Sequence, residues 1–412
     1  MVSGKRQTSR RGFLKGAAAG AAGAAAFTIV PRHVLGGKGS VAPSDTFGGA
    51  LIGCGGRGSG THRGLGPNVK RLASCDVKFL DRVNNKTIYS DFRRVLERKD
   101  IDLIAIATPP HWHALISIAA MQAGKDVLCE KPATRFIAEG RALVEAEKRY
   151  NRIYQVGTYG RYKASRNKGS ILTHKIMRSG LLKNNQGVHF KSGGLKVKQW
   201  SGIVNPKPMA IPKFLDWDMY CGPAPLRPYH KHRTGGTHRG YWDYEGGGMA
   251  DMGQHHFDPV QWTYGKDDTS AVEIEAHAPL AHPEACGMWG WVEMKYADGW
   301  TVVMESREWG KRYDRKKPRG VSLSDLSEED QAKVKAMGDP EPMVSFPDAI
   351  RTRKRPGGHA EAAHRAACIM HLANIAIRVG RKIKYDPVKE QIIGDEEANR
   401  LVNPPMRAPW HL

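Results

Sequence analysis

The stretch from residue 101 to residue 132 constrains the fold more than any other part of the sequence. An almost unbroken apolar run (101–107) precedes a helical pattern of apolar residues at three- and four-residue spacing, and a second apolar run follows at 127–129. Continuous apolar runs are typical of strands that are covered on both faces of a parallel sheet. The stretch therefore predicts a strand, a helix that ends at Gly124, and a second parallel strand.

Polar side chains directly follow both of these strands. They are Thr108, His111, His113, Glu130 and Lys131. Ligands of open parallel sheets bind outside the carboxyl ends of the strands. We therefore expect a cofactor to lie against these residues.

A G-x-G-x-x-G motif at 53–58 follows an earlier apolar run. Its glycines permit a tight turn, a close backbone approach to a pyrophosphate and close helix packing. A chain with 46 glycines also produces this spacing by chance. The main support for a dinucleotide-binding motif is therefore Asp76, which follows the glycines by about the number of residues expected of a ribose-binding carboxylate. A turn or cap role for Asp76 is the alternative. A carboxylate here repels a 2′-phosphate, which favours NAD over NADP.

Together these motifs predict the cofactor contacts. The expected residues are Gly53, Cys54, Gly55, Gly56, Arg57, Gly58, Asp76, Thr108, Pro109, His113, Glu130 and Lys131.

Only about a dozen residues separate Asp76 from Tyr89, which leaves little room for a crossover helix.

The chain changes character after residue 160. Residues 158–248 are rich in Gly, Pro, aromatic and basic residues, and 271–306 reads as antiparallel strands with a tight turn at 297–299. We predict an α/β Rossmann domain with a doubly wound parallel sheet over 45–160. A substrate-binding α+β domain with an open, largely antiparallel sheet follows over 161–412.

The segment 246–258 predicts a glycine turn that opens a helix. Asp251 and His255 are four residues apart and so lie on one face of that helix. A capping carboxylate and a structural histidine are the alternative roles. A metal site is not predicted, because His255 and His256 point to different helix faces and no third ligand is placed by the spacing.

Several motifs resemble the glucose/fructose oxidoreductase, inositol dehydrogenase and MocA family, in particular its exported twin-arginine branch. They are GCGGRG, ATPPHWHALISIAAMQAGKDVLCEKP, QVGTYGR, CGPAP, GGGMADMGQHHFD and the segment from Gly380 to Trp410. The resemblance implies a Rossmann domain with NAD or NADP at the strand ends and substrates among sugars and polyols. It also implies that Lys131, Asp251 and His255 are catalytic.

Those residue types fit the oxidation of a secondary alcohol. His255 is the expected base, Lys131 the group that hydrogen-bonds the substrate oxygen, and Asp251 the group that orients the imidazole. We expect Arg161, Trp242 and His255 to contact the substrate. For Trp242 the reason is that aromatic faces with polar tips suit sugar rings.

Three functions compete at this point. The first is a sugar or polyol oxidoreductase with tightly held NAD, and the second is a glycosidase that oxidises its substrate transiently. The third, a noncatalytic glycan-binding protein, is disfavoured by Lys131, Asp251 and His255. We expect a homo-oligomer.

The net charge of +23 raises the question of an anionic partner. The basic residues are spread along the chain without a nucleic-acid motif, so we expect no nucleic acid. The chain through Ser40 carries seven of the positive charges and no acidic residue.

The first 35 residues resemble an export signal and linker. Ser9 to Lys15, SRRGFLK, is a twin-arginine signature and precedes a Gly/Ala tract that is too short and too glycine-rich to span a membrane stably. A flexible basic tail is the alternative. Twin-arginine export carries folded proteins, so we expect periplasmic protein loaded with cofactor in the cytoplasm.

The export hypothesis predicts a specific defect. Replacing both arginines (Arg10→Lys with Arg11→Lys) should leave folded, cofactor-loaded protein in the cytoplasm, because the signature rather than the charge is recognised. Activity in periplasmic and cytoplasmic fractions measures this. Undiminished periplasmic activity of the double variant would contradict the hypothesis.

Overall fold

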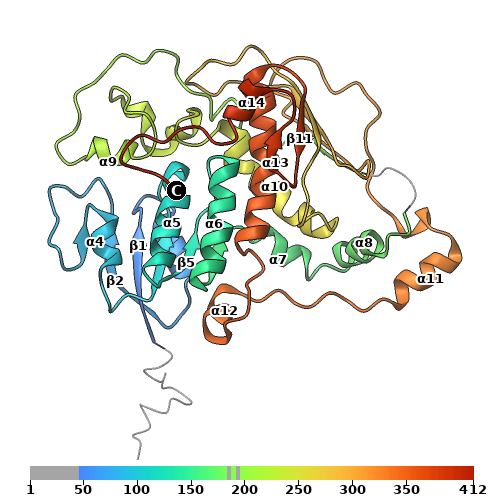
Figure 1. Ribbon diagram of the computed structural model, residues 1–412, viewed down its shortest axis with the longest axis horizontal. Coiled ribbons are helices and arrows are strands. Elements are labelled where there is room, and N and C mark those ends of the chain that lie inside the picture. The colour runs from blue at the N-terminus through green and yellow to red at the C-terminus, as the bar shows by residue number, and fades with distance from the viewer. Residues whose placement is uncertain (1–45, 183–186, 192–194) are drawn as a thin grey trace, which may run out of the picture. The chain divides into compact units, whose positions relative to one another are not determined.

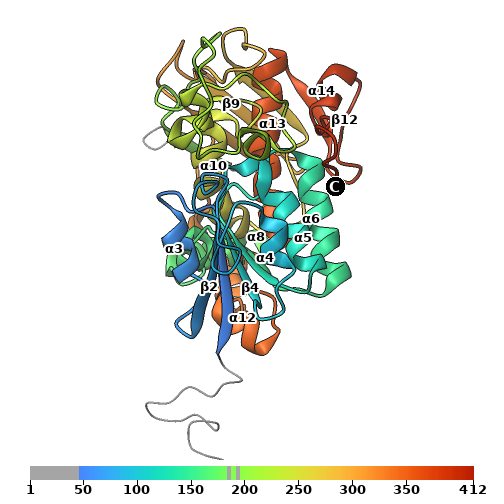
Figure 2. The same ribbon diagram turned by 90° about the vertical axis from the view of Figure 1, so that its left-hand side faces the viewer.

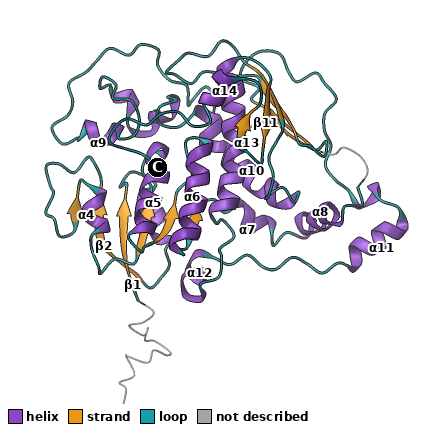
Figure 3. Ribbon diagram, in the orientation of Figure 1, coloured by secondary structure: helices purple, strands orange, loops and turns teal. Residues whose placement is uncertain are grey.

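The computed structural model describes residues 46–182, 187–191 and 195–412. Residues 47–412 form one compact unit that contains two sheets. The predicted export signal lies outside the described residues. Figure 1 shows the elements along the chain, and Figure 3 separates strands from helices and loops.

The first sheet has six parallel strands in the order β3-β2-β1-β4-β5-β6. This order reverses between β1 and β4, as in doubly wound dinucleotide-binding folds, and it confirms the predicted Rossmann sheet. Its strands are β1 (Phe47–Ile52), β2 (Val69–Cys75), β3 (Ile88–Tyr89), β4 (Leu103–Ile106), β5 (Asp126–Cys129) and β6 (Tyr154–Val156).

One face of this sheet is covered by α4 (Phe92–Leu96), α5 (His113–Gln122) and α6 (Ile137–Tyr150). The opposite face carries α3 (Gly58–Arg63), and Figure 2 shows α3 on one side of the strands with α4, α5 and α6 on the other. All four residues of β4 and all four of β5 are buried, which explains the continuous apolar runs at 103–106 and 127–129.

A helix from far along the chain completes the second face. The side chains of α12 (Phe346–Thr352) pack with Leu51, Leu103 and Leu128 of the first sheet. The predicted domain boundary at residue 160 therefore separates stretches of sequence that share a core.

The connection between β2 and β3 has no helix. The chain passes through turns between Cys75 and Ile88, and β3 has only two residues. The dozen residues counted from the sequence are indeed too few for a crossover helix.

The second sheet has the strand order β12-β11-β8-β9-β10-β7. Only the β10–β7 pair is parallel, and the predicted hairpin joins β9 to β10. This confirms the largely antiparallel sheet. Its strands are β7 (Gly187–Lys191), β8 (Glu273–His277), β9 (Trp291–Lys295), β10 (Thr301–Glu305), β11 (Ile383–Asp386) and β12 (Gln391–Ile392).

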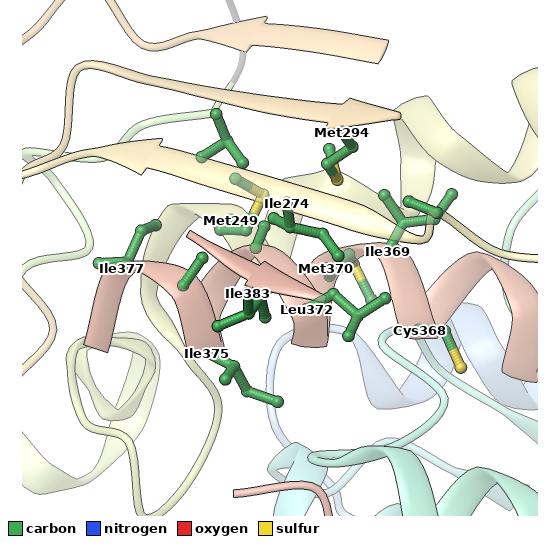
Figure 4. Packing of buried hydrophobic residues seen from close by; sticks show 14 of the residues in the cluster. Met249, Ile274, Met294, Cys368, Ile369, Met370, Leu372, Ile375, Ile377 and Ile383 are labelled. Atoms are coloured by element: carbon green, nitrogen blue, oxygen red, sulfur yellow. The ribbon is translucent and has the colours of Figure 1, made fainter. Parts of the chain in front are cut away.

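Two long helices pack on this sheet, α10 (Gly247–Thr263) and α13 (Ala360–Val379). Figure 4 shows apolar side chains of α13 meeting Met249 of α10, Ile274 of β8 and Met294 of β9. Helix α13 also contacts α6, where a Cβ on Gly140 would lie 2.1 Å from His364 Nδ1. Helix α13 therefore joins the cores of both sheets.

Shorter elements connect these layers. They are α7 (Gly160–Ala164), α8 (Lys168–Ser179), α9 (Trp217–Cys221), α11 (Glu328–Ala336), α14 (Glu396–Arg400) and the 3₁₀ turns η2 (Pro110–Trp112), η3 (Lys231–Arg233), η4 (Gly235–Gly240) and η5 (Leu323–Asp325).

The packing of α12 makes a testable prediction. Phe346→Ala should lower the free energy of unfolding by about 3–5 kcal/mol, because the ring is buried between α12 and the first sheet. Leu280→Ala is the control, since Leu280 is 95% exposed and its loss should change the value by less than about 0.5 kcal/mol. Denaturant titrations followed by tryptophan fluorescence measure both, and equal effects would contradict the assignment.

Candidate functional site

A cavity of about 750 Å³ lies at the carboxyl ends of β1, β2, β4 and β5. Residues that follow these four strands form one wall, and segments between α9 and α10 form another. The described cavity wall includes ten predicted site residues: Gly53, Gly55, Gly56, Arg57, Asp76, Thr108, Pro109, Glu130, Lys131 and His255. The topological switch between β1 and β4 thus places the cavity where the sequence predicted a cofactor.

The glycine loop has the three properties expected of its spacing. Gly53 has φ +89°, and a Cβ there would lie 2.5 Å from the backbone nitrogen of Thr108. A Cβ on Gly55 or Gly56 would meet no atom within 4 Å. A Cβ on Gly58 would lie 2.5 Å from the carbonyl oxygen of Gly53. The loop therefore turns tightly, leaves open space along the cavity and packs closely on α3.

Asp76 holds this loop in place. Its Oδ2 accepts a hydrogen bond from the backbone N–H of Cys54 (2.8 Å), and its Oδ1 accepts one from that of Lys78 (3.0 Å). Asp76 also lines the cavity, so the turn role and the predicted ribose contact are compatible. Burial raises the pKa of the Cys54 thiol to about 12, which keeps that thiol protonated.

Glu130 fixes the other side of the glycine loop. Its Oε1 accepts hydrogen bonds from Arg57 Nε (2.7 Å) and Thr61 Oγ1 (2.9 Å). This pairing ties the end of β5 to the start of α3. Arg57 remains more than half exposed and lines the cavity beside Gly55 and Gly56.

His113, predicted as a cofactor contact, is instead turned into the protein. Its ring nitrogens lie 2.7 Å from the carbonyl oxygen of Pro132 and 2.8 Å from that of Thr108, and it is fully buried outside the described cavity wall. It links the loops after β4 and β5. Thr108 itself lines the cavity, and its buried Oγ1 has no hydrogen-bond partner among the described residues.

Lys131 and Asp251 form the central contact of the site. Lys131 Nζ donates to Asp251 Oδ1 (2.6 Å) and to the Asp251 carbonyl oxygen (2.7 Å). Arg239 Nε lies 2.8 Å from the same Oδ1. Burial raises the pKa of Asp251, but Lys131 and Arg239 together outweigh it and lower that pKa below its usual value. The peptide bond between Lys131 and Pro132 is cis.

His255 lines the cavity one helical turn after Asp251. Burial, assisted by the charge of Lys131, lowers its pKa to about 4, so the imidazole is neutral at pH 7. The described structure contains no hydrogen bond between Asp251 and His255. The carboxylate that was expected to orient the imidazole is paired with Lys131 and Arg239.

The two other predicted substrate contacts lie elsewhere. Arg161 is 2% exposed and pairs with Asp258 (2.9 Å) and Asp267 (2.7 Å). The indole N–H of Trp242 donates to the carbonyl oxygen of His282. Neither lies in the described cavity wall, because each finds partners that are distant in the sequence.

Sequence reasoning missed part of the cavity wall. Among the unpredicted members are Tyr220, His238, Arg239 and Glu245. Of these four residues, Glu245 is the one that the sequence could have indicated, because it directly precedes the glycine turn of the helix that carries Asp251 and His255. The others come from loops without a periodic pattern.

Fold and site together define a nucleotide-dependent oxidoreductase architecture, and comparison with protein families agrees. Residues 67–158 match the family model described as "Oxidoreductase family, NAD-binding Rossmann fold". Residues 170–412 match its companion, "Oxidoreductase family, C-terminal alpha/beta domain". The chain therefore belongs to the glucose/fructose oxidoreductase, inositol dehydrogenase and MocA family, and its first sheet forms an NAD-binding domain.

Curated relatives align over limited stretches. The chain is 34% identical over 116 residues to the levoglucosan dehydrogenase of Pseudarthrobacter phenanthrenivorans, covering 28% of each chain. It is 33% identical over 93 residues to the inositol 2-dehydrogenase of Salmonella typhimurium, covering 22% of this chain and 26% of the relative. A glycosyl hydrolase family 109 protein of Solibacter usitatus is 31% identical over 157 residues, 34% of this chain and 36% of the relative. The chain thus spans about a quarter to a third of the length of these relatives.

Solved structures extend the likeness in fold. The WlbA dehydrogenase of Bordetella pertussis, crystallised with NADH and UDP-GlcNAcA, superposes with a TM-score of 0.51 at 14% identity. The match covers 83% of this chain and 99% of that one. At this identity the match supports the two-sheet architecture alone.

The residues of this chain fit an NAD molecule. Gly55 and Gly56 leave open space beside the start of α3, Asp76 faces the same cavity, and Thr108 offers a buried hydroxyl without a partner.

Among the described residues there is no group of three or more potential metal ligands, and no helix is both long and apolar enough to cross a membrane.

The lowered pKa of His255 predicts the pH dependence of the reaction. A base must be neutral to accept a proton, so the acid limb of kcat/KM should lie near pH 4 rather than near the ordinary histidine value of 6.5. Lys131→Met should raise the pKa of His255 only in part, because burial is the larger cause. NMR titration of the imidazole, assigned with His255→Ala, measures both values. A wild-type pKa near 6.5 would contradict the prediction.

Proposed function

We propose that this protein is an NAD-dependent oxidoreductase that acts on a secondary alcohol of a sugar, a polyol or a sugar derivative. The observation that carries the proposal is the presence of Lys131 and His255 in one cavity with the glycine loop of the NAD-binding domain. An ammonium group and a neutral imidazole at the same wall are suited to binding an alcohol oxygen and removing its proton.

Each catalytic residue then has a distinct role. Lys131 donates a hydrogen bond to the substrate oxygen and stabilises the developing alkoxide. His255 accepts the hydroxyl proton, since it is neutral at pH 7. Asp251 holds Lys131 in place through two hydrogen bonds. Bound NAD would supply the acceptor for the hydride that leaves the carbon bearing this hydroxyl group.

The substrate class rests on the relatives, whose names include levoglucosan and inositol 2-dehydrogenases. We extend the proposal to export by the twin-arginine route into the periplasm and to assembly as a homo-oligomer. Free nicotinamide cofactor is scarce outside the cytoplasm, so NAD should be retained between turnovers. NAD released on denaturing the purified protein would support this, whereas protein with no nucleotide and no affinity for one would not.

A glycosidase acting by transient oxidation is the second candidate. It is favoured by the match to relatives named glycosyl hydrolase family 109 proteins. Net hydrolysis of an aryl glycoside without net NADH formation would identify this activity. Net NADH formation from an unsubstituted polyol would identify the dehydrogenase instead.

The roles of Lys131 and His255 predict non-additive kinetics. Lys131→Met and His255→Ala should each lower turnover by roughly 10²- to 10⁴-fold, the usual contribution of a positioned acid or base group. The double variant should be little worse than either single variant, because both groups act on one proton. Asp251→Asn should retain more activity than His255→Ala. Single-turnover reduction of bound NAD measures the chemical step.

NAD affinity provides the control. All of these variants should still bind NAD, because the glycine loop at Gly53, Gly55 and Gly58 is unchanged. If Lys131→Met chiefly weakens NAD binding and leaves the single-turnover rate near normal, Lys131 binds the cofactor and its assignment as a catalytic residue is wrong.

A further inference from the structure

Glu245 is a buried carboxylate in the cavity wall that the reaction described above does not use. Its side chain is 1% exposed. Gly246, with φ +141°, follows it, and the carbonyl oxygen of Gly246 accepts a hydrogen bond from Asn374 Nδ2 (3.1 Å). A Cβ on Gly246 would lie 2.5 Å from that nitrogen, so only glycine fits here. The backbone thus fixes Glu245 at the start of α10.

Glu245 belongs to a continuous row of charges along the wall. Arg239 Nε lies 2.8 Å from Asp251 Oδ1 and 3.8 Å from Glu245 Oε2, and Asp251 also binds Lys131. The Arg239 guanidinium packs 4.8 Å from the ring centre of Trp200, which holds it in the row. Two cations, Lys131 and Arg239, therefore balance two carboxylates, Asp251 and Glu245.

The carboxylate of Glu245 retains capacity to bind a ligand. Its Oε2 lies 3.1 Å from His238 Nε2, yet it accepts no hydrogen bond of good geometry from any described residue. A buried acceptor without a hydrogen bond is costly. If the side chain turns toward the cavity, an entering hydroxyl group would remove that cost by donating to this oxygen.

The same row disfavours an acidic ligand. Each of its cations already has a carboxylate partner, so a carboxylate placed next to this row would lose its hydration without gaining an unpaired cation there. A neutral polyol loses less hydration free energy than a carboxylate when it enters the cavity, and it carries several hydroxyl donors.

We propose that Glu245 is a specificity-determining residue that accepts a hydrogen bond from a second substrate hydroxyl and selects neutral sugars and polyols over sugar acids. The inference rests on the proposed function, because that function places the reacting alcohol at Lys131 and His255.

Calorimetric titration of the NADH-loaded protein tests it without turnover. The probes are D-glucose, myo-inositol and D-glucuronate, which differs from D-glucose by a carboxylate in place of one CH₂OH group. The wild type should bind both neutral probes more tightly than D-glucuronate. Glu245→Gln should weaken D-glucose binding about 10- to 100-fold, as expected for a hydrogen bond to a charged group. It should also lower the ratio of D-glucose affinity to D-glucuronate affinity at least about tenfold, because Arg239 then lacks one of its two carboxylate neighbours.

Glu284→Gln is the matched control. Glu284 also lies between two arginines, Arg227 (2.9 Å) and Arg233 (2.8 Å), but outside the described cavity wall. Its replacement should leave the affinity ratio unchanged. If Glu245→Gln fails to fold and bind NADH, Glu245→Asp takes its place, since it should lose D-glucose affinity while still rejecting D-glucuronate.

Three results would overturn the inference: a wild type that prefers D-glucuronate, no binding of either neutral probe, or an affinity ratio unchanged by Glu245→Gln. Where Glu245→Asp replaces that variant, an unchanged affinity for D-glucose takes the place of the third result. Discrimination that persists in a protein unable to reduce NAD would reject the proposed function but not this role of Glu245. Dehydrogenation without discrimination would reject this role alone.

Discussion

The contact between Lys131 and the carboxylate of Asp251 joins the two halves of the candidate site. Lys131 follows β5 of the first sheet, whereas Asp251 belongs to α10, which packs on the second sheet. Both side chains are largely buried, at 12% and 6% exposure. Removing one partner of a buried pair typically costs about 3–5 kcal/mol, because the other charge is left alone. Here Arg239 also pairs with Asp251, so the loss of Lys131 leaves no unpaired carboxylate.

Two more side chains of α10 bind the same region. Gln254 Oε1 accepts a hydrogen bond from the backbone N–H of Ala133, and Asp258 accepts one from Thr158 Oγ1 (2.6 Å). With Asp251, they occupy positions i, i+3 and i+7, which form one face of a helix. This polar face of α10 meets the segments that leave β5 and β6. His255 lies next to that face and is thereby brought to the cavity.

The fold was largely predictable because its signals are local. Buried parallel strands, the glycine loop and the β9–β10 turn each leave a pattern within a few residues. Among the predicted site residues, Lys131 and His255 both line the cavity, and the position of each follows directly from the end of a strand or from a helix. Arg161 and His113 were misplaced since their partners, Asp258 and the Pro132 carbonyl, become neighbours only through folding. The position of α12 on the first sheet likewise depends on contacts between residues that are far apart in the sequence.

Such long-range contacts explain how a site divided between two sheets can keep its geometry. Catalysis by a positioned acid or base needs its groups held to within about an ångström. Helix α13 packs against both α6 and α10, and Gln254 Nε2 donates to the Ala363 carbonyl oxygen of α13 (3.2 Å). Near the end of the chain, Arg407 donates to the Gly222 carbonyl oxygen (2.9 Å), just after α9, whose Tyr220 lines the cavity. Helix α13 and Arg407 therefore connect elements that surround the cavity, including α10, which carries His255, and α9, which carries Tyr220.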